Sequence, residues 1–269
     1  MSGDGEKLVD AKAILVCEFA KMIITLGVLL YASVLDIRTR EIEPRLWLFS
    51  GMVLFAIMLL EEAVCFSKGD VLRLALGTLV ILVAVGGLYY TGLIGGGDLF
   101  SLIVISTSHQ WNPFSIVRGN PGVVELPFVL PVVLYASLAA ALYSVLLCIV
   151  NLTVNLKELK RVPGKMKIVY MFTALPLRAR DLKNKRFWYP LERPWDKKKK
   201  FRSTFDVCED DTIIRRKVES LIAHGALNEN QKLWCTYGIP FIVYITIGYI
   251  ATLLGGDKLL LSGITRLIK

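Results

Sequence analysis

Long stretches almost free of charge are the feature that most constrains this chain of 269 residues. Several run for about 18 residues or more, which is the length that a helix needs to cross a hydrocarbon core of roughly 30 Å. They lie at residues 14–35, 46–60, 74–94, 99–107, 123–152 and 233–254, the fourth being short for a full crossing. The sequence therefore predicts an all-α polytopic membrane protein with six transmembrane helices.

A polar segment of different character separates the fifth span from the sixth. Short aromatic runs such as Phe187-Trp188-Tyr189 indicate a small loop-rich or strand-containing unit with its own core, and residues 211–223 have the pattern of a short amphipathic helix. We therefore expect three parts. These are residues 1–152 with helices 1–5, residues 153–232 as a small cytoplasmic domain, and residues 233–269 with helix 6 and the C-terminal tail.

Basic charge gives the orientation of these spans. The chain has a net charge of +9, and 20 of its 32 Lys and Arg residues lie within residues 153–232. Basic loops stay on the cytoplasmic side of a membrane, which explains the charge without a nucleic-acid partner. Through six spans, the loop at residues 36–45 and the turn at residues 95–98 fall on that same side. The run at residues 197–200 is then a solvated basic loop or a contact for anionic lipid.

Metal and cofactor chemistry find little support in the composition. The five cysteines are scattered with no C-x-x-C spacing, and His109 and His224 are the two histidines. We therefore expect neither a metal site nor a cofactor. His109 is expected at the outer membrane interface. Glu18 and Lys21 are one helical turn apart and are expected to pair.

Two carboxylates are placed where chemistry is plausible. Asp36 ends the first span and Asp98 begins the fourth, so both fall at the predicted cytoplasmic face. Carboxylates near hydrocarbon are costly unless they are paired or wetted, and two held together share one proton, as in aspartic proteases. Glycines at positions 95–97 allow positive φ and a close approach of substrate backbone to Asp98.

Plainer interpretations remain open for both residues. Asp36, close to Arg38 and Arg40, is also consistent with a solvated helix end, and Asp98 with an N-cap. The similar string at residues 255–257, which ends in Asp257, serves as an internal comparison. It falls at the opposite end of the last span, where we interpret it as a turn.

The motifs around these carboxylates resemble a known family. The segment Leu35-Asp36-Ile37-Arg38-Thr39-Arg40-Glu41-Ile42-Glu43-Pro44 is similar to the first aspartate motif of type IV prepilin peptidases and archaeal preflagellin peptidases. Gly95-Gly96-Gly97-Asp98 resembles their GxGD motif, and Gly238-Ile239-Pro240-Phe241-Ile242 resembles a Pro-containing segment near the active site. The matches extend over most of the chain and favour the archaeal branch. The chain departs from many relatives in having Glu43 before Pro44 and no second Pro after Pro240.

The resemblance implies a membrane-embedded aspartyl endopeptidase at the cytoplasmic membrane. Its substrates would be preflagellin or type IV pilin-like preproteins, from which it would remove a short basic leader, the class III signal peptide. Asp36 and Asp98 would be catalytic, and Gly95, Gly96, Gly97 and Pro240 would contact substrate. Glu41 and Glu43 are candidates to hold the basic leader, or they simply balance nearby arginines. The oligomeric state is not indicated.

Other classes of function stay in view. A signal peptide peptidase-like intramembrane protease would use the same chemistry, although relatives of that kind are longer and carry Tyr before the first Asp. A transporter that uses Asp36 and Asp98 as a proton or cation site would show gradient-driven uptake. A structural subunit of a secretion machine would make both carboxylates dispensable.

Overall fold

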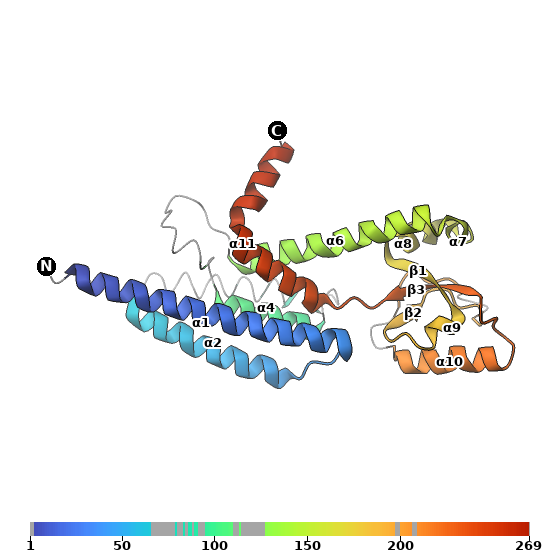
Figure 1. Ribbon diagram of the computed structural model, residues 1–269, viewed down its shortest axis with the longest axis horizontal. Helices are drawn as coiled ribbons and strands as arrows, with labels where there is room; N and C mark the ends of the chain where they lie inside the picture. Colours follow the sequence, from blue (N-terminus) through green and yellow to red (C-terminus); the bar gives the residue numbers. More distant parts are fainter. Residues whose placement is uncertain are drawn as a thin grey trace. The chain divides into compact units, whose positions relative to one another are not determined.

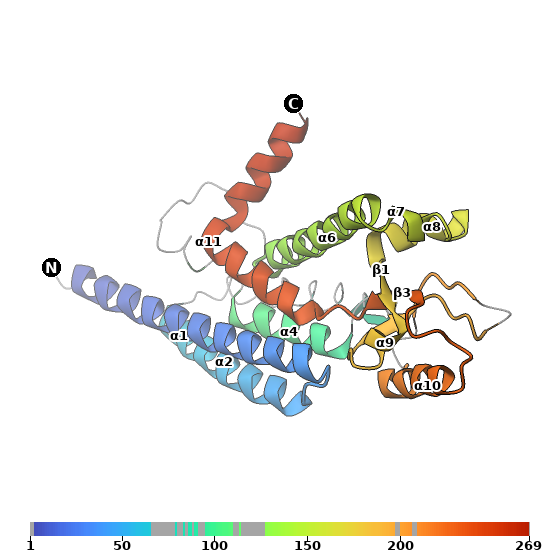
Figure 2. The same ribbon diagram turned by 45° about the vertical axis from the view of Figure 1, so that its right-hand side comes forward.

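The computed structural model describes residues 3–65, 95–109, 127–196, 200–205 and 209–268, together with single positions between residues 79 and 113. The chain is mostly helical and divides into two compact units. The first comprises residues 1–139 and 240–269, and the second comprises residues 140–239. Figures 1 and 2 show the first unit as helices and the second as a small sheet with helices on it.

The first unit is a helical bundle with an apolar core. Its helices are α1 (Gly3–Arg38), α2 (Pro44–Cys65), α4 (Gly96–Ser108), the first part of α6 (Val129–Thr153) and α11 (Phe241–Ile268). Helix α1 packs against α2, α4 and α11, and α4 also contacts α2 and α11. Leu29, Leu54, Ile105 and Ile245, one from each of these four helices, are fully buried between them. The outer surface is also apolar, as a helix surface that faces lipid must be.

Three helices of the described residues are long and apolar enough to cross a membrane. They are Ala13–Arg38, Pro44–Glu61 and Val129–Thr153, with shorter apolar helices at Gly96–Ser108 and Phe241–Gly255. The prediction of a helical membrane protein is thus confirmed, while the number of six spans is not. Most of the predicted span at residues 74–94 lies outside the described residues, and residues 123–126 of the fifth span and 197–199 of the basic run lie wholly outside them.

Two predictions for the C-terminal region are wrong. Residues 233–237 were assigned to the sixth span but form strand β3 (Lys232–Tyr237), so the helix begins at Phe241. A short apolar run fits a strand as well as a helix, which is why the pattern misleads there. Residues 255–257, interpreted as a turn, lie within α11. Glycine is frequent in membrane helices and does not end this one.

Helices α11 and α6 approach closely at a glycine. A Cβ added at Gly248 would lie 2.3 Å from the carbonyl oxygen of Val132 and 2.9 Å from the backbone nitrogen of Ala136. Small residues allow such backbone contact between membrane helices. The crossing of α11 and α6 therefore depends on the absence of a side chain at residue 248.

Replacing Gly248 by Ala should therefore separate the two helices. We expect the Gly248→Ala variant to lose about 1–3 kcal/mol of unfolding free energy through overpacking. Gly27→Ala is the matched control, because a Cβ at that helical position meets no atom within 4 Å. Reversible unfolding in detergent or bicelles measures both, and equal stability of the two variants would contradict the crossing.

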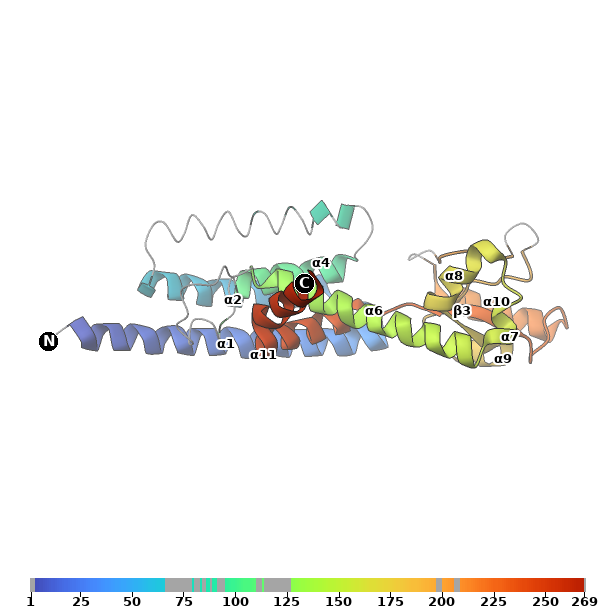
Figure 3. The same ribbon diagram turned by 90° about the horizontal axis from the view of Figure 1, so that it is seen from above.

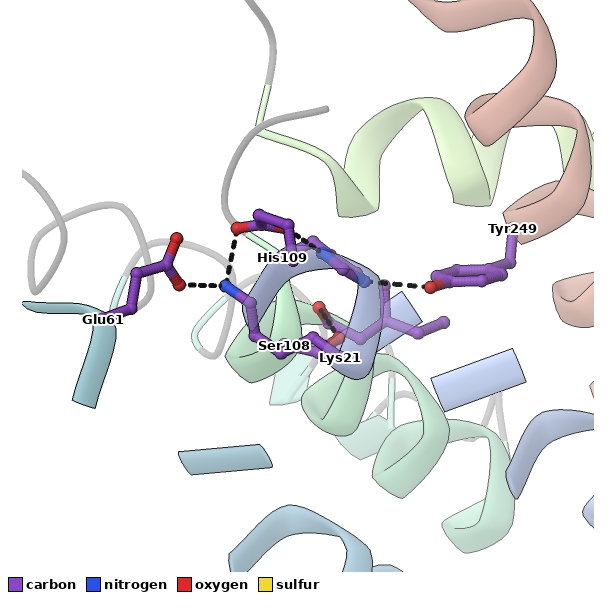
Figure 4. A network of polar contacts seen from close by, with 7 residues as sticks. Lys21, Glu61, Ser108, His109 and Tyr249 are labelled. Carbon is purple, nitrogen blue, oxygen red and sulfur yellow. Dashed lines mark hydrogen bonds and ion pairs between the residues drawn. The ribbon is translucent and has the colours of Figure 1, made fainter. Parts of the chain in front are cut away.

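A buried polar network joins four helices of this bundle (Figure 4). Lys21 on α1 pairs with Glu18 at 2.6 Å and with Glu61 on α2. The Nδ1 atom of His109, which follows α4, lies 3.1 Å from Glu18 Oε2, and its Nε2 atom lies 2.9 Å from the Tyr249 hydroxyl on α11. Figure 4 shows Glu61 and Tyr249 at opposite ends of these contacts, with Lys21 and His109 between them.

The network confirms one prediction and corrects another. Glu18 and Lys21 pair as their spacing indicates. His109, expected at the outer membrane interface, is instead 1% exposed and held by Glu18 and Tyr249. Ionisable groups enter an apolar bundle when they satisfy one another, and the partners of His109 come from sequence-distant helices.

Removing the cation from this network should strongly destabilise the folded protein. We expect Lys21→Met to lower the unfolding free energy by about 3–5 kcal/mol, because Glu18 and Glu61 would then stay buried without a counter-charge. Lys21→Arg keeps the charge and should retain a larger share of the stability. Thermal unfolding in detergent distinguishes them, and a Lys21→Met protein as stable as the wild type would argue against a charged network.

The second unit contains a three-stranded antiparallel sheet in the order β1-β3-β2. Strands β1 (Ala174–Arg178) and β2 (Trp188–Pro190) flank β3 (Lys232–Tyr237), with Leu175 opposite Cys235 and Tyr189 opposite Thr236. Helices α9 (Ala179–Leu182) and α10 (Asp211–Ala223) cover one face, and α7 (Leu156–Leu159) and α8 (Gly164–Thr173) cover the other (Figure 1).

The alternation of β3 builds a core on each face of the sheet. Leu233 and Cys235 join the core beneath α9 and α10, whereas Trp234 joins the core beneath α7 and α8. The expected amphipathic helix is α10, where Asp210 caps the N-terminus by accepting the Thr212 N–H at 2.8 Å. Tyr189 lies in the first core, with Trp188 and Trp195 packed on it, as the aromatic runs indicate.

Candidate active site

Asp36 lies in the last full turn of α1 and is mostly buried, at 9% exposure. Its Oδ2 atom accepts the backbone N–H of Ile242 at 3.3 Å, and its Oδ1 atom lies 3.5 Å from Arg40 Nη1. Ile242 belongs to the first turn of α11, whose N–H groups have no partner within the helix. The Asp36 carboxylate therefore occupies the positive end of the α11 dipole.

Asp98 holds an equivalent position on α4. It is the third residue of that helix, and its Oδ2 atom accepts the N–H of Gly95 at 3.0 Å. The capping position itself belongs to Gly95, so the N-cap interpretation of Asp98 is replaced by a carboxylate that folds back on the helix start. Asp36 and Arg40 are both near enough for their charges to act on Asp98.

Apolar contacts bring the two carboxylate-bearing segments together. A Cβ built at Gly97 on α4 would lie 3.3 Å from Ile242 Cδ1 and 3.9 Å from Ile42 Cδ1. Ile42 belongs to the loop that follows Asp36, and Ile242 provides the N–H that Asp36 accepts. The first turn of α4 is thus packed between the α1–α2 loop and the start of α11.

The glycines at positions 95–97 have ordinary backbone angles, and their contribution is the absence of a side chain. Gly95 has φ of −80°, Gly96 and Gly97 are helical, and Gly225 is the positive-φ glycine among the described residues. The expectation of positive φ is therefore wrong for Gly95, and close approach is the reason that applies to Gly97. A Cβ at Gly96 would meet no atom within 4 Å, so that side of the turn is open.

The remaining predicted site residues lie around these segments. Glu41 and Glu43 are exposed in the extended loop between α1 and α2, which begins at Arg40 with a φ of 61°. Pro240 directly precedes α11, and its carbonyl accepts the Val243 N–H at 3.2 Å. It therefore lies outside the helix, two residues from the N–H that contacts Asp36.

Sequence reasoning missed three contributors to this site. The Ile242 N–H and the Ile42 and Ile242 side chains act through helix starts and loop packing that no residue pattern identifies. Pro240 was the available signal, because Pro is common at helix starts, where its missing N–H is not needed. Ser33 and Thr246 add a 2.8 Å hydroxyl contact between α1 and α11 nearby.

Comparison with known proteins finds two family models and one similar protein. Residues 23–145 match the model of the type IV leader peptidase family, and residues 166–258 match the model described as archaeal peptidase A24 C-terminus, type II. The chain is also 25% identical over 234 residues to a preflagellin peptidase of Methanococcus maripaludis, which covers 86% of this chain and 93% of the relative.

The apolar helices and these matches together define a membrane-embedded protease. The chain belongs to the type IV leader peptidase family, and its function is the proteolytic removal of leader peptides. Neither a transporter nor a signal peptide peptidase-like enzyme is favoured by these matches.

Enlarging Gly97 should disturb the site without unfolding the bundle. In Gly97→Val the side chain would push Ile42 and Ile242 apart and displace the carboxylates that these segments hold. We expect leader cleavage to fall by up to about 10²-fold, since misplacement by 1 Å can cost that much. Gly27→Val, on an exposed position of α1, is the control and should cleave normally. Normal cleavage by Gly97→Val would separate this packing from catalysis.

Proposed function

We propose that Asp36 and Asp98 are the catalytic pair of an aspartyl endopeptidase. The observation that carries the proposal is that both carboxylates accept a backbone N–H at a helix start, on α11 and α4, while Gly97 packs between those segments. One carboxylate is ionised and takes a proton from the attacking water. The other is protonated and donates its proton to the scissile carbonyl oxygen as the water oxygen bonds to the carbonyl carbon. The first carboxyl then gives the water proton to the leaving nitrogen, the C–N bond breaks, and a hydroxyl of the tetrahedral intermediate returns a proton to the second carboxylate as the new carboxyl group forms.

The substrates are preproteins of the preflagellin and type IV pilin kind. The family match and the preflagellin peptidase relative support this assignment. A class III signal peptide has a short basic leader in front of a hydrophobic helix, and the cleaved bond lies between the two. The open side at Gly96, between Gly95 and Gly97, provides room for an extended backbone next to Asp98, and Pro240 at the start of α11 is a further candidate to contact substrate.

The active site faces the cytoplasm. The support comes from charge, because 20 of the 32 Lys and Arg residues lie within residues 153–232, directly after α6. This segment, completed by the strand up to Tyr237, is the water-exposed domain. A basic leader remains on the same side during insertion of the preprotein, so leader and carboxylates meet there.

The test is cleavage of a preflagellin by detergent-solubilised protein. Asp36→Asn and Asp98→Asn should each lower the cleavage rate by at least about 10²–10⁴-fold, because each variant lacks a proton acceptor or donor. Asp257→Asn, in the string with similar composition, should cleave at the wild-type rate. Cleavage retained by either Asn variant would refute the pair, and no cleavage by the wild type would refute the substrate class.

Glu41 and Glu43 are proposed to hold the basic leader, since both are exposed in the loop that contributes Ile42 to the site. The variant Glu41→Gln with Glu43→Gln should raise KM several-fold at low salt and leave kcat near the wild-type value. The effect should disappear at high salt, because exposed charges are screened there. A KM that does not change at low salt would assign the two glutamates to balancing nearby arginines.

A further inference from the structure

Helix α8 is fixed to the end of the membrane-spanning helix α6. Asn151, in the last turn of α6, has no exposed surface, and its side-chain amide donates to the carbonyls of Tyr170, Met171 and Ala174 at 3.3, 3.0 and 2.8 Å. These carbonyls lie at the C-terminal end of α8, where a helix leaves its acceptors without partners. The side-chain amide of Asn155 donates to the side-chain oxygen Oδ1 of Asn151 at 3.0 Å.

The position of Asn151 places α8 at the boundary between lipid and water. Apolar side chains of α6 on either side of Asn151 are exposed, among them Leu146, Ile149 and Leu152, as expected for a surface that contacts lipid. Figures 1 and 3 show α8 running across the direction of α6 rather than continuing it. A helix that crosses a spanning helix at its end lies along the membrane surface.

The free face of α8 has the composition of an interfacial helix. Tyr170 is fully buried in the core with Trp234. The opposite side of the helix carries Lys165, Ile168 and Phe172 at i, i+3 and i+7, and Ile168 is 67% exposed. Apolar side chains flanked by lysines on one helix face are typical of helices that rest in the headgroup region.

The charge around this face is strongly positive. The segment from residue 154 to residue 173 contains five basic residues and one acidic residue. The basic residues are Lys157, Lys160, Arg161, Lys165 and Lys167. The acidic residue, Glu158, pairs with Lys232 at 2.6 Å, and this contact lowers the pKa of Glu158 and keeps it ionised. Lys232 therefore matches this negative charge from outside the segment. The charge of Arg161 also acts on Glu158 and Glu192, and the four lysines remain for another partner.

We propose that residues 154–173 form a membrane-surface element that binds anionic lipid headgroups. Ile168 and Phe172 rest at the level of the upper acyl chains, and the lysine side chains extend to the lipid phosphates. The element anchors the water-exposed domain to the bilayer next to α6. This inference does not depend on the roles of Asp36 and Asp98.

Depth-dependent quenching tests the proposal on the full-length protein in nanodiscs. A fluorophore is attached at Ile168→Cys, with Cys17, Cys65, Cys148 and Cys208 replaced by Ser. Cys235 stays, because burial raises the pKa of its thiol and makes it unreactive. Ile213→Cys is the matched control, since Ile213 is 63% exposed on α10, on the other face of the same sheet.

Lipids carrying a quencher on the acyl chain should quench the label at residue 168 several-fold more than the label at residue 213. The difference should be larger in nanodiscs with phosphatidylglycerol than in nanodiscs of phosphatidylcholine alone. Equal quenching of the two labels would overturn the surface element. Equal quenching of residue 168 in both lipids would overturn the recognition of anionic headgroups.

A matched pair of charge variants separates headgroup binding from general basicity. Lys160→Gln with Lys165→Gln should abolish the extra quenching in phosphatidylglycerol, since both lysines are exposed. Lys183→Gln with Arg216→Gln, which removes the same charge elsewhere on the domain, should not. Wild-type circular dichroism of both variants verifies folding. The Asp36→Asn protein should quench like the wild type, so failure of this proposal and failure of the catalytic proposal give different results.

Discussion

The cost of a charge in hydrocarbon governs where ionisable residues stand in the membrane unit. Helix α1 carries such groups near both ends, and 18 residues separate Glu18 from Asp36. At 1.5 Å per residue they are about 27 Å apart, close to the thickness of a hydrocarbon core. At one end Glu18 and Lys21 meet Glu61 and His109, and at the other Asp36 accepts a helix N–H. Polar contacts therefore fix α1 at both ends, with apolar packing between them.

The candidate site combines two helix starts with one charged partner, Arg40, which lies 3.5 Å from Asp36. A carboxylate at the N-terminus of a helix gains from the dipole and from free N–H groups, yet it stays available to a substrate on its other oxygen. Asp98 uses the start of α4 and Asp36 the start of α11. Since these starts belong to different parts of the sequence, the pair forms only when α1, α4 and α11 pack correctly. The packing at Gly97 and Gly248 is thereby connected to the chemistry.

The sequence predicts those features that rest on composition and short spacing. Uncharged runs identify α1, α2 and α6, the i, i+3 spacing pairs Glu18 with Lys21, and the amphipathic pattern locates α10. The resemblance of the motifs around Asp36 and Asp98 predicts the same family as the comparisons show.

The remaining features depend on partners that are distant in sequence. The sequence places His109 at the membrane interface because it does not show that Glu18 and Tyr249, on other helices, contact its ring. The sequence predicts that residues 233–237 begin a span. They form a strand instead, because β1 and β2 provide hydrogen-bond partners on both sides. The sequence shows Asn151 only as a polar residue near a helix end, because the three carbonyls to which it donates lie 19 to 23 positions further along the chain.

The most direct test of the central claim is the proximity of residues 36 and 98 in the folded protein. A cysteine-free background carrying Asp36→Cys and Asp98→Cys would be treated in membranes with short bifunctional thiol reagents. The control pair Asp36→Cys with Ser108→Cys joins the same two helices, but Ser108 lies ten residues, or about 15 Å, further along α4. The account predicts efficient cross-linking of the 36/98 pair and little of the control. Absence of the 36/98 cross-link, or equal cross-linking of both pairs, would contradict a shared site for the two aspartates.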